Sequence, residues 1–155
     1  MKETERIADQ LSRAFAGPAW HGSSLRELLN GVTAARAAAR PVAGAHSVWE
    51  VVLHIAAWDA AMRRRLAGER AEIYQTDLDW PKVFDTSETA WQQTLAQLTQ
   101  AHDELRQAIT ELDEARLDEP ILEGMPSVYV SLHGVIQHDL YHAGQIAVLL
   151  KASAS

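Results

Sequence analysis

The sequence contains no cysteine among its 155 residues. This absence excludes disulfide bonds, thiolate metal ligands and a cysteine nucleophile. No stretch approaches the ~18 apolar residues of a membrane-spanning helix, and the polar start, Met1-Lys-Glu-Thr-Glu-Arg, lacks the apolar core of a signal peptide. From these absences we expect no membrane partner and a cytoplasmic location.

Basic residues are scarce as well. The chain has 14 Lys and Arg against 21 Asp and Glu, for a net charge of -7. Nucleic-acid-binding proteins need a basic footprint to displace counterions. The one basic cluster, Arg63-Arg64-Arg65, falls near the end of a predicted helix, where cations interact favourably with the helix dipole. We therefore expect no nucleic-acid partner and a small molecule as the substrate.

Helix is the secondary structure that the sequence favours, because alanine is abundant and β-branched runs are few. Apolar residues recur every three or four positions in long segments bounded by capping or helix-breaking residues. Long helices are expected over residues 3–16, 47–67, 87–112 and 131–151. A short extra helix is expected over residues 24–31, and residues 33–40 also have a helical pattern.

These segments predict an all-α fold, a four-helix bundle with a long connection over residues 69–85 between the second and third long helices. We expect a single domain over residues 1–152 and a short disordered tail over residues 153–155. The connection is unusually long for a compact domain, so it is expected to pack over the bundle or to shape the mouth of a pocket.

Three histidines suggest a metal site. His138 and His142 stand four residues apart on the apolar stripe of the last helix, so their rings lie one above the other. His54 lies in an apolar stretch in the middle of the second long helix, and bundles build metal sites from inward side chains on facing helices. The alternative is that all three are core histidines bonded to each other or to backbone. Three protein ligands would leave a coordination position open, as in catalytic sites.

The histidines belong to longer motifs that resemble a known family. Residues 138–146, with the sequence His-Asp-Leu-Tyr-His-Ala-Gly-Gln-Ile, are the most specific, and residues 20–29, 44–58, 79–81 and Trp91 add to the match. The chain resembles the DinB/YfiT-like family of metal-dependent enzymes. The resemblance implies a four-helix bundle, frequently a homodimer, in which these histidines bind a divalent ion, often nickel or zinc. The matching positions are His54, His138 and His142.

An open position on such an ion could hold water or a thiolate. Two reactions follow, hydrolysis and transfer of a low-molecular-weight thiol, which must come from a cosubstrate because the chain has no cysteine. Relatives that look like thiol-dependent transferases and isomerases favour the second. A non-catalytic metal-binding or small-ligand-binding stress-response protein is the main alternative, and a helical interaction module with structural histidines is another.

Two polar residues near the predicted ligands have two interpretations each. His133, five residues before His138, could act as a general acid or base, or could be a surface histidine near the start of the helix. Glu50, one turn before His54, could orient that imidazole, or could form a capping box with Ser47.

The remaining candidates are weighed by their position on the helices. Asp139 points about 100° away from His138 and is expected to be solvated. Gln145 could reach the pocket, three residues after His142. His102 lies on the apolar stripe of the third long helix and is the candidate for a fourth ligand, although it is far along that helix. Tyr141 and Trp58 are expected in the core, with a pocket wall as the alternative.

Overall fold

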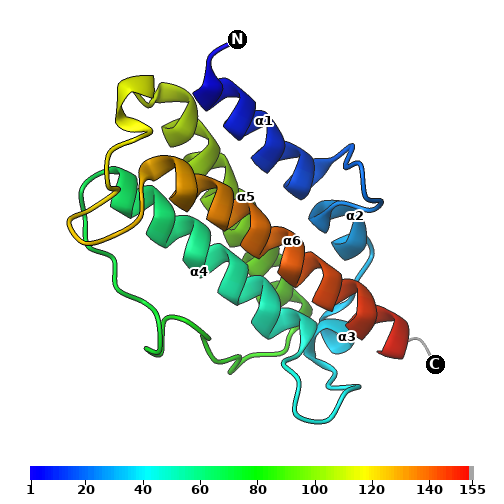
Figure 1. Ribbon diagram of the computed structural model, residues 1–155. Coiled ribbons are helices and arrows are strands. Elements are labelled where there is room, and N and C mark those ends of the chain that lie inside the picture. The colour runs from blue at the N-terminus through cyan, green and yellow to red at the C-terminus, as the bar shows by residue number, and fades with distance from the viewer. Residues whose placement is uncertain (154–155) are drawn as a thin grey trace.

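The computed structural model describes residues 1–153, and helices are its regular secondary structure over that range. Four long helices form the bundle: α1 (Glu3–Ala16), α4 (Val48–Leu66), α5 (Glu88–Glu111) and α6 (Val128–Ser153). Between them lie α2 (Leu25–Leu29), α3 (Ala34–Ala38) and the single 3-10 turn η1 (Glu114–Arg116), as Figure 1 shows. The predicted all-α bundle is confirmed. Among residues 1–153, no helix has both the length and the apolar character needed to cross a membrane.

The direction of the helices explains the long connection. In Figure 1, α4 and α5 run the same way, whereas α1 and α6 run the opposite way. A parallel neighbour can be reached only if the chain travels back along the full length of α4, and its 19 residues span about 28 Å. Residues 67–87 make this return, and Ala71 and Ile73 are buried against Ala61 of α4. The connection therefore packs over the bundle, as expected.

The start of α4 is fixed by a capping box. The Ser47 hydroxyl accepts a hydrogen bond from the Glu50 backbone N–H (3.2 Å), and the Glu50 carboxylate accepts one from the Ser47 backbone N–H (2.7 Å). Arg40 also pairs with Glu50. Of the two roles considered for Glu50, the structure thus shows the cap, which sets the register that turns His54 inward.

The last helix begins earlier than its sequence pattern indicates. It was expected from residue 131, yet α6 begins at Val128. The Ser127 hydroxyl accepts from the Val130 N–H (3.2 Å), and the Val128 N–H donates to the Glu119 carbonyl (2.8 Å). The preceding loop thus supplies partners for N–H groups that a helix start leaves free, and this partnership is not visible in the local sequence.

The end of α6 also differs from the expectation. The helix reaches Ser153, the first residue of the predicted disordered tail, and the rest of that tail, residues 154–155, lies outside the described residues. The Arg36 guanidinium donates to the Leu150 carbonyl (2.8 Å) and to the Ser153 hydroxyl (3.3 Å). These bonds join α3 to the last turn of α6, where the Leu150 carbonyl also accepts from the Ser153 hydroxyl (3.1 Å).

His102 belongs to the hydrophobic core and not to a metal site. Its ring, 3% exposed, stacks on Phe15 of α1 with the ring centres 4.0 Å apart. Its Nδ1 has no hydrogen-bond partner among the described residues. Burial lowers the pKa of His102 to about 4. It is therefore neutral at physiological pH, and its protonation opposes folding.

Replacing His102 by phenylalanine should make the protein less sensitive to acid. The pKa of His102 is lower in the folded protein (about 4) than the ordinary 6.5, so unfolded chains bind the proton first and stability falls as pH drops from 6.5 towards 4. At about 1.4 kcal/mol per pKa unit, this cost reaches about 2.5 kcal/mol at pH 4.5. Urea unfolding at pH 7.5 and at pH 4.5 gives the free energy of unfolding that each protein loses between the two pH values. For His102→Phe this loss should be smaller than for wild type by about 2.5 kcal/mol. A loss equal to that of wild type, or of the exposed control His21→Gln, would contradict the assignment.

Candidate metal centre

Three imidazole rings meet between α4 and α6. His54 comes from α4, and His138 and His142 come from successive turns of α6. One nitrogen of each ring lies within 4.8 Å of those of the other two. Nε2 of His54 and Nε2 of His138 are 3.0 Å apart. The structure therefore brings together the three residues predicted as ligands.

Hydrogen bonds fix the tautomer of two of the rings. The Nδ1 of His54 lies 2.6 Å from the Asp79 carbonyl oxygen, and the Nδ1 of His142 lies 2.6 Å from Oε1 of Gln145. Both oxygens can only accept, so each Nδ1 carries the hydrogen and donates it. In a neutral ring this leaves the lone pair on Nε2, which is the form that binds a metal.

His138, the third ring, and its neighbour Asp139 each have a buried polar atom without a partner within residues 1–153. Nδ1 of His138 is buried without a hydrogen-bond partner among the described residues, and so is Oδ1 of Asp139, 3.6 Å away. If Nε2 of His138 binds an ion, its proton must move to Nδ1, where Asp139 can accept it. The two orphaned atoms thus fit a site that an ion completes.

The spacing of the nitrogens also fits one ion. Histidine nitrogens bind zinc at about 2.0–2.1 Å, so two of them on one ion are at most about 4.2 Å apart. The three nitrogens here lie within 4.8 Å of one another. Small rotations of the rings would close the difference. Among the described residues, no fourth His, Cys, Asp or Glu joins the cluster, so the set matches a site with an open position.

Burial keeps these rings uncharged. Because burial disfavours the imidazolium, the pKa of His138 and that of His142 fall to about 4, and the pKa of His54 is lowered as well. Only neutral imidazoles bind metal, so protons compete weakly with an ion at neutral pH.

Trp80, in the connection, holds the His54 ring from one side. The two rings stack with centres 3.8 Å apart and planes 7° from parallel. His46 stacks on the opposite face of Trp80 at 3.7 Å. The three rings form a continuous stack, so the plane of His54 is fixed by packing as well as by its hydrogen bond.

Asp79, next to Trp80, is buried and joins the connection to α4 through its side chain. Its carboxylate accepts hydrogen bonds from Nε1 of Trp58 (2.9 Å) and from the backbone N–H of Gln75 (3.1 Å). Oδ1 of Asp79 also lies 3.2 Å from Nδ1 of His54. Both carboxylate oxygens are therefore engaged by neighbouring groups, and Asp79 lies on the Nδ1 side of the His54 ring.

A cavity of about 500 Å³ opens beside the three rings. Besides the histidines it is lined by residues of α4, α6 and the connection: Trp58, Tyr74, Asp79, Trp80, Gly134, Gln137 and Tyr141. Tyr141 is 67% exposed, so the expectation that it lies in the core is wrong, and the pocket-wall alternative holds. The cavity gives a small molecule direct access to the site.

Comparison with protein families shows which family the chain belongs to. A family profile described as the DinB superfamily matches residues 19–146, which is most of the chain and includes all three histidines. The chain belongs to the DinB superfamily. Among curated proteins and among solved structures, no match was found.

Asp139 is not solvated in this DinB superfamily chain, contrary to the expectation from its helical position. It is 4% exposed and faces Asp59 of α4, which is fully buried. Burial raises the pKa of both carboxyls well above the ordinary value, and the charge of Asp139 adds to the effect on Asp59. Two buried carboxylates that face each other also repel, so burial and this repulsion both favour a proton on the pair.

His133 is not brought to the site. Its ring lies 4.4 Å from that of Tyr129, and its Nε2 is buried without a hydrogen-bond partner among the described residues. It is not one of the residues that line the cavity beside the metal ligands. Five residues on a helix correspond to a rotation of about 140°, so His133 and His138 face different directions. The geometry gives no support to the general acid or base role considered for it.

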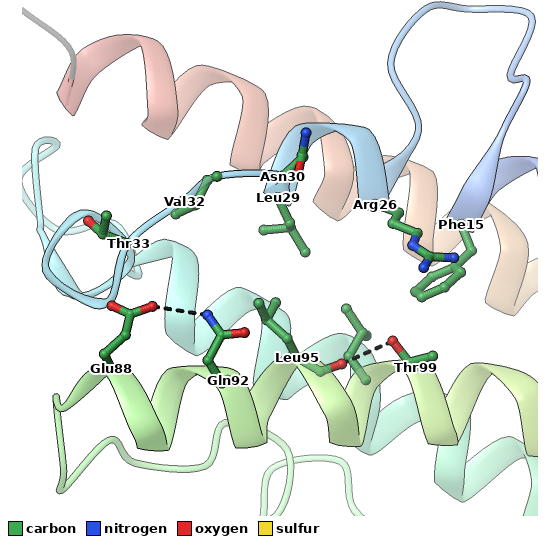
Figure 2. Close-up of a pocket in the computed structure, with 12 residues that line it drawn as sticks. Phe15, Arg26, Leu29, Asn30, Val32, Thr33, Glu88, Gln92, Leu95 and Thr99 are labelled. Atoms are coloured by element: carbon green, nitrogen blue, oxygen red, sulfur yellow. Dashed lines mark hydrogen bonds between the residues drawn. The ribbon is translucent and has the colours of Figure 1, made fainter.

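A second cavity of about 360 Å³ lies between residues 26–33 and α5, away from the histidines. Figure 2 shows Phe15 and Arg26 at one end and Thr33 and Glu88 at the other. Among the described residues that line it, the one carboxylate, that of Glu88, already has partners: it accepts from the Gln92 amide (3.0 Å) and from the Ala34 N–H (2.9 Å). This cavity therefore lacks the unpartnered ligand atoms that distinguish the metal centre.

Metal binding should release few protons even in mild acid. Three ordinary imidazoles with a pKa of about 6.5 would be roughly three-quarters protonated at pH 6 and would release more than two protons together. Here the pKa of His138 and that of His142 are about 4, and that of His54 is lowered, so we expect release of fewer than about one proton in all. Zinc titration calorimetry at pH 6.0 in buffers of different ionisation enthalpy measures this number. Release of two or more protons would show that the rings are ordinary, exposed histidines.

Removing the acceptor of His142 should weaken metal binding. Gln145→Leu leaves the His142 Nδ1–H without its bond, and the loss of such a supporting group typically costs 10- to 100-fold in metal affinity. Gln137→Leu is the matched control, because Gln137 also lies on α6 and lines the cavity. Competition with a chromophoric chelator gives both affinities. Equal affinities for the two variants would mean that Gln145 does not orient the ligand.

Proposed function

We propose that this DinB superfamily protein is a metal-dependent enzyme that acts on a small molecule, as a thiol transferase or a hydrolase. The main support for this proposal is the set of three neutral imidazoles beside an open cavity, two of them held in the metal-binding tautomer. Zinc or nickel is the proposed ion, since imidazole suits both. A homodimer, which the family resemblance implies, and the identity of the thiol stay predictions.

A divalent ion in this ligand set supplies a positive charge that stabilises an anion next to it and lowers the pKa of a bound water or thiol. The residues of the chain would hold the ion and orient its ligands. All three ligands are neutral, so the ligand set itself cancels none of the charge. Asp79 and Gln145 hold the rings in place, and the cavity beside the rings leaves room for a small molecule.

Two reactions could take place at such a metal site. In thiol transfer, a small thiol releases its proton to solvent, its sulfur forms a bond to an electrophilic carbon, and the bond from that carbon to the leaving group breaks, with the electron pair going to the leaving group. In hydrolysis, water takes the place of the thiol. The chain contributes no cysteine of its own, so the sulfur must arrive with a cosubstrate. The family membership supports this proposal at the level of the metal site, and the choice between the reactions rests on assay.

The assay compares metal-loaded wild type with ligand variants. Untagged protein is loaded with zinc or nickel, and turnover is followed with p-nitrophenyl acetate and with 1-chloro-2,4-dinitrobenzene plus a thiol. We expect His54→Ala and His142→Ala to lose at least about 100-fold, a typical scale for removing a principal electrostatic contribution to catalysis. His21→Ala, an exposed histidine, should retain activity. Turnover that is the same in wild type and in the ligand variants would reject an enzymatic role for the site.

A non-catalytic metal or small-ligand binding protein is the second candidate. One observation favours it: apart from the three ligands, Asp79 is the only His, Asp or Glu within residues 1–153 that lines the cavity, and its oxygens are already engaged. This candidate predicts stabilisation without turnover. Free metal at 100 times its Kd should stabilise the fold by about 2.7 kcal/mol, and His54→Ala should abolish the shift in melting temperature.

A further inference from the structure

The rim of the metal cavity carries two exposed aromatic rings. Tyr74 comes from the connection and Tyr141 from α6, and they are 66% and 67% exposed. The Tyr141 ring stands edge-on to that of His142, with centres 5.1 Å apart. The two tyrosines therefore bring aromatic surface from two segments to the entrance of one site.

The other two aromatic residues of the cavity are less free to bind a ligand. Trp80 is covered on both faces, by His46 and by His54. Trp58 has the Arg65 guanidinium over its ring at 5.4 Å, and its Nε1 is bonded to Asp79. Tyr74 and Tyr141 are thus the two aromatic residues of the cavity with the most exposed ring surface for a ligand to cover.

The charge of the cavity restricts the ligand further. None of the described residues that line it is Lys or Arg. Sites that bind phosphate or several carboxylates use Arg and Lys to pair with them. Within this cavity, a bound ion would be the one positive charge that a ligand could meet, so there is a place for one anionic or metal-binding group and none for a second.

We propose that this site takes small molecules in which a single metal-binding group is joined to a flat aromatic or conjugated ring, with the ring packed against Tyr74 and Tyr141. The cavity of about 500 Å³ has the size of small-molecule sites. Phosphorylated and polycarboxylate molecules are excluded as occupants of this cavity. This inference rests on the proposed metal site and adds the class of ligand to it.

Two hydroxamates test the ring contact, because both bind metal through the same group. Acetohydroxamate carries a methyl group, and benzohydroxamate carries a phenyl ring. On zinc-loaded wild type, calorimetry should give at least about 10-fold tighter binding of benzohydroxamate, since aromatic contacts and burial add to the metal bond. Tyr141→Ala and Tyr74→Ala should each reduce this ratio several-fold, and the ratio itself corrects for any change in the metal bond that the two probes share. Tyr129→Ala, an exposed tyrosine of α6 outside the cavity, should keep the wild-type ratio.

Charge is tested with 4-carboxybenzohydroxamate, which should bind no tighter than benzohydroxamate. A wild-type ratio in both Tyr74→Ala and Tyr141→Ala would overturn the proposed ring contact. Markedly tighter binding of the carboxylated probe would overturn the inference that the cavity has no place for a second anionic group. If zinc itself does not bind, the proposed metal site fails. If zinc binds but neither hydroxamate binds the zinc-loaded protein, the proposed open position on the ion fails, and both results are distinct from a failure of the ligand class.

Discussion

The hydrogen bond from the His54 imidazole to the Asp79 carbonyl is the contact on which the site depends. It ties the connection between α4 and α5 to the middle of α4, and it sets the tautomer that directs the Nε2 lone pair inward. The adjacent Trp80 then stacks on the same ring. A segment that the topology requires as a return path along α4 thereby becomes the wall of the metal cavity and the support of one ligand.

Buried neutral imidazoles are costly without partners, and two of the three have an acceptor for their Nδ1–H here. His54 and His142 use backbone and amide oxygens, whereas His138 lies next to Asp139, whose carboxyl faces Asp59. The carboxyl pair is buried, so it retains a proton and does not add two negative charges behind the ligands. The site therefore keeps most of the charge of a bound ion available to a substrate.

The sequence predicted the parts of the site that depend on local spacing. The four-residue interval of His138 and His142 and the capping box that opens α4 are local patterns, and both appear in the structure. The burial of Asp139 could not be predicted, because its partner Asp59 belongs to a different helix. The stacking of Trp80 on His54 and the early start of α6 likewise depend on contacts between segments far apart in the chain.

X-ray absorption spectroscopy of the zinc-loaded protein tests the central claim most directly, because the spectrum counts imidazole ligands around the ion. We predict three imidazole nitrogens and at least one solvent oxygen in wild type, and two imidazoles in His54→Ala. An identical imidazole count in the two proteins would show that His54, and with it the connection that supports it, takes no part in metal binding.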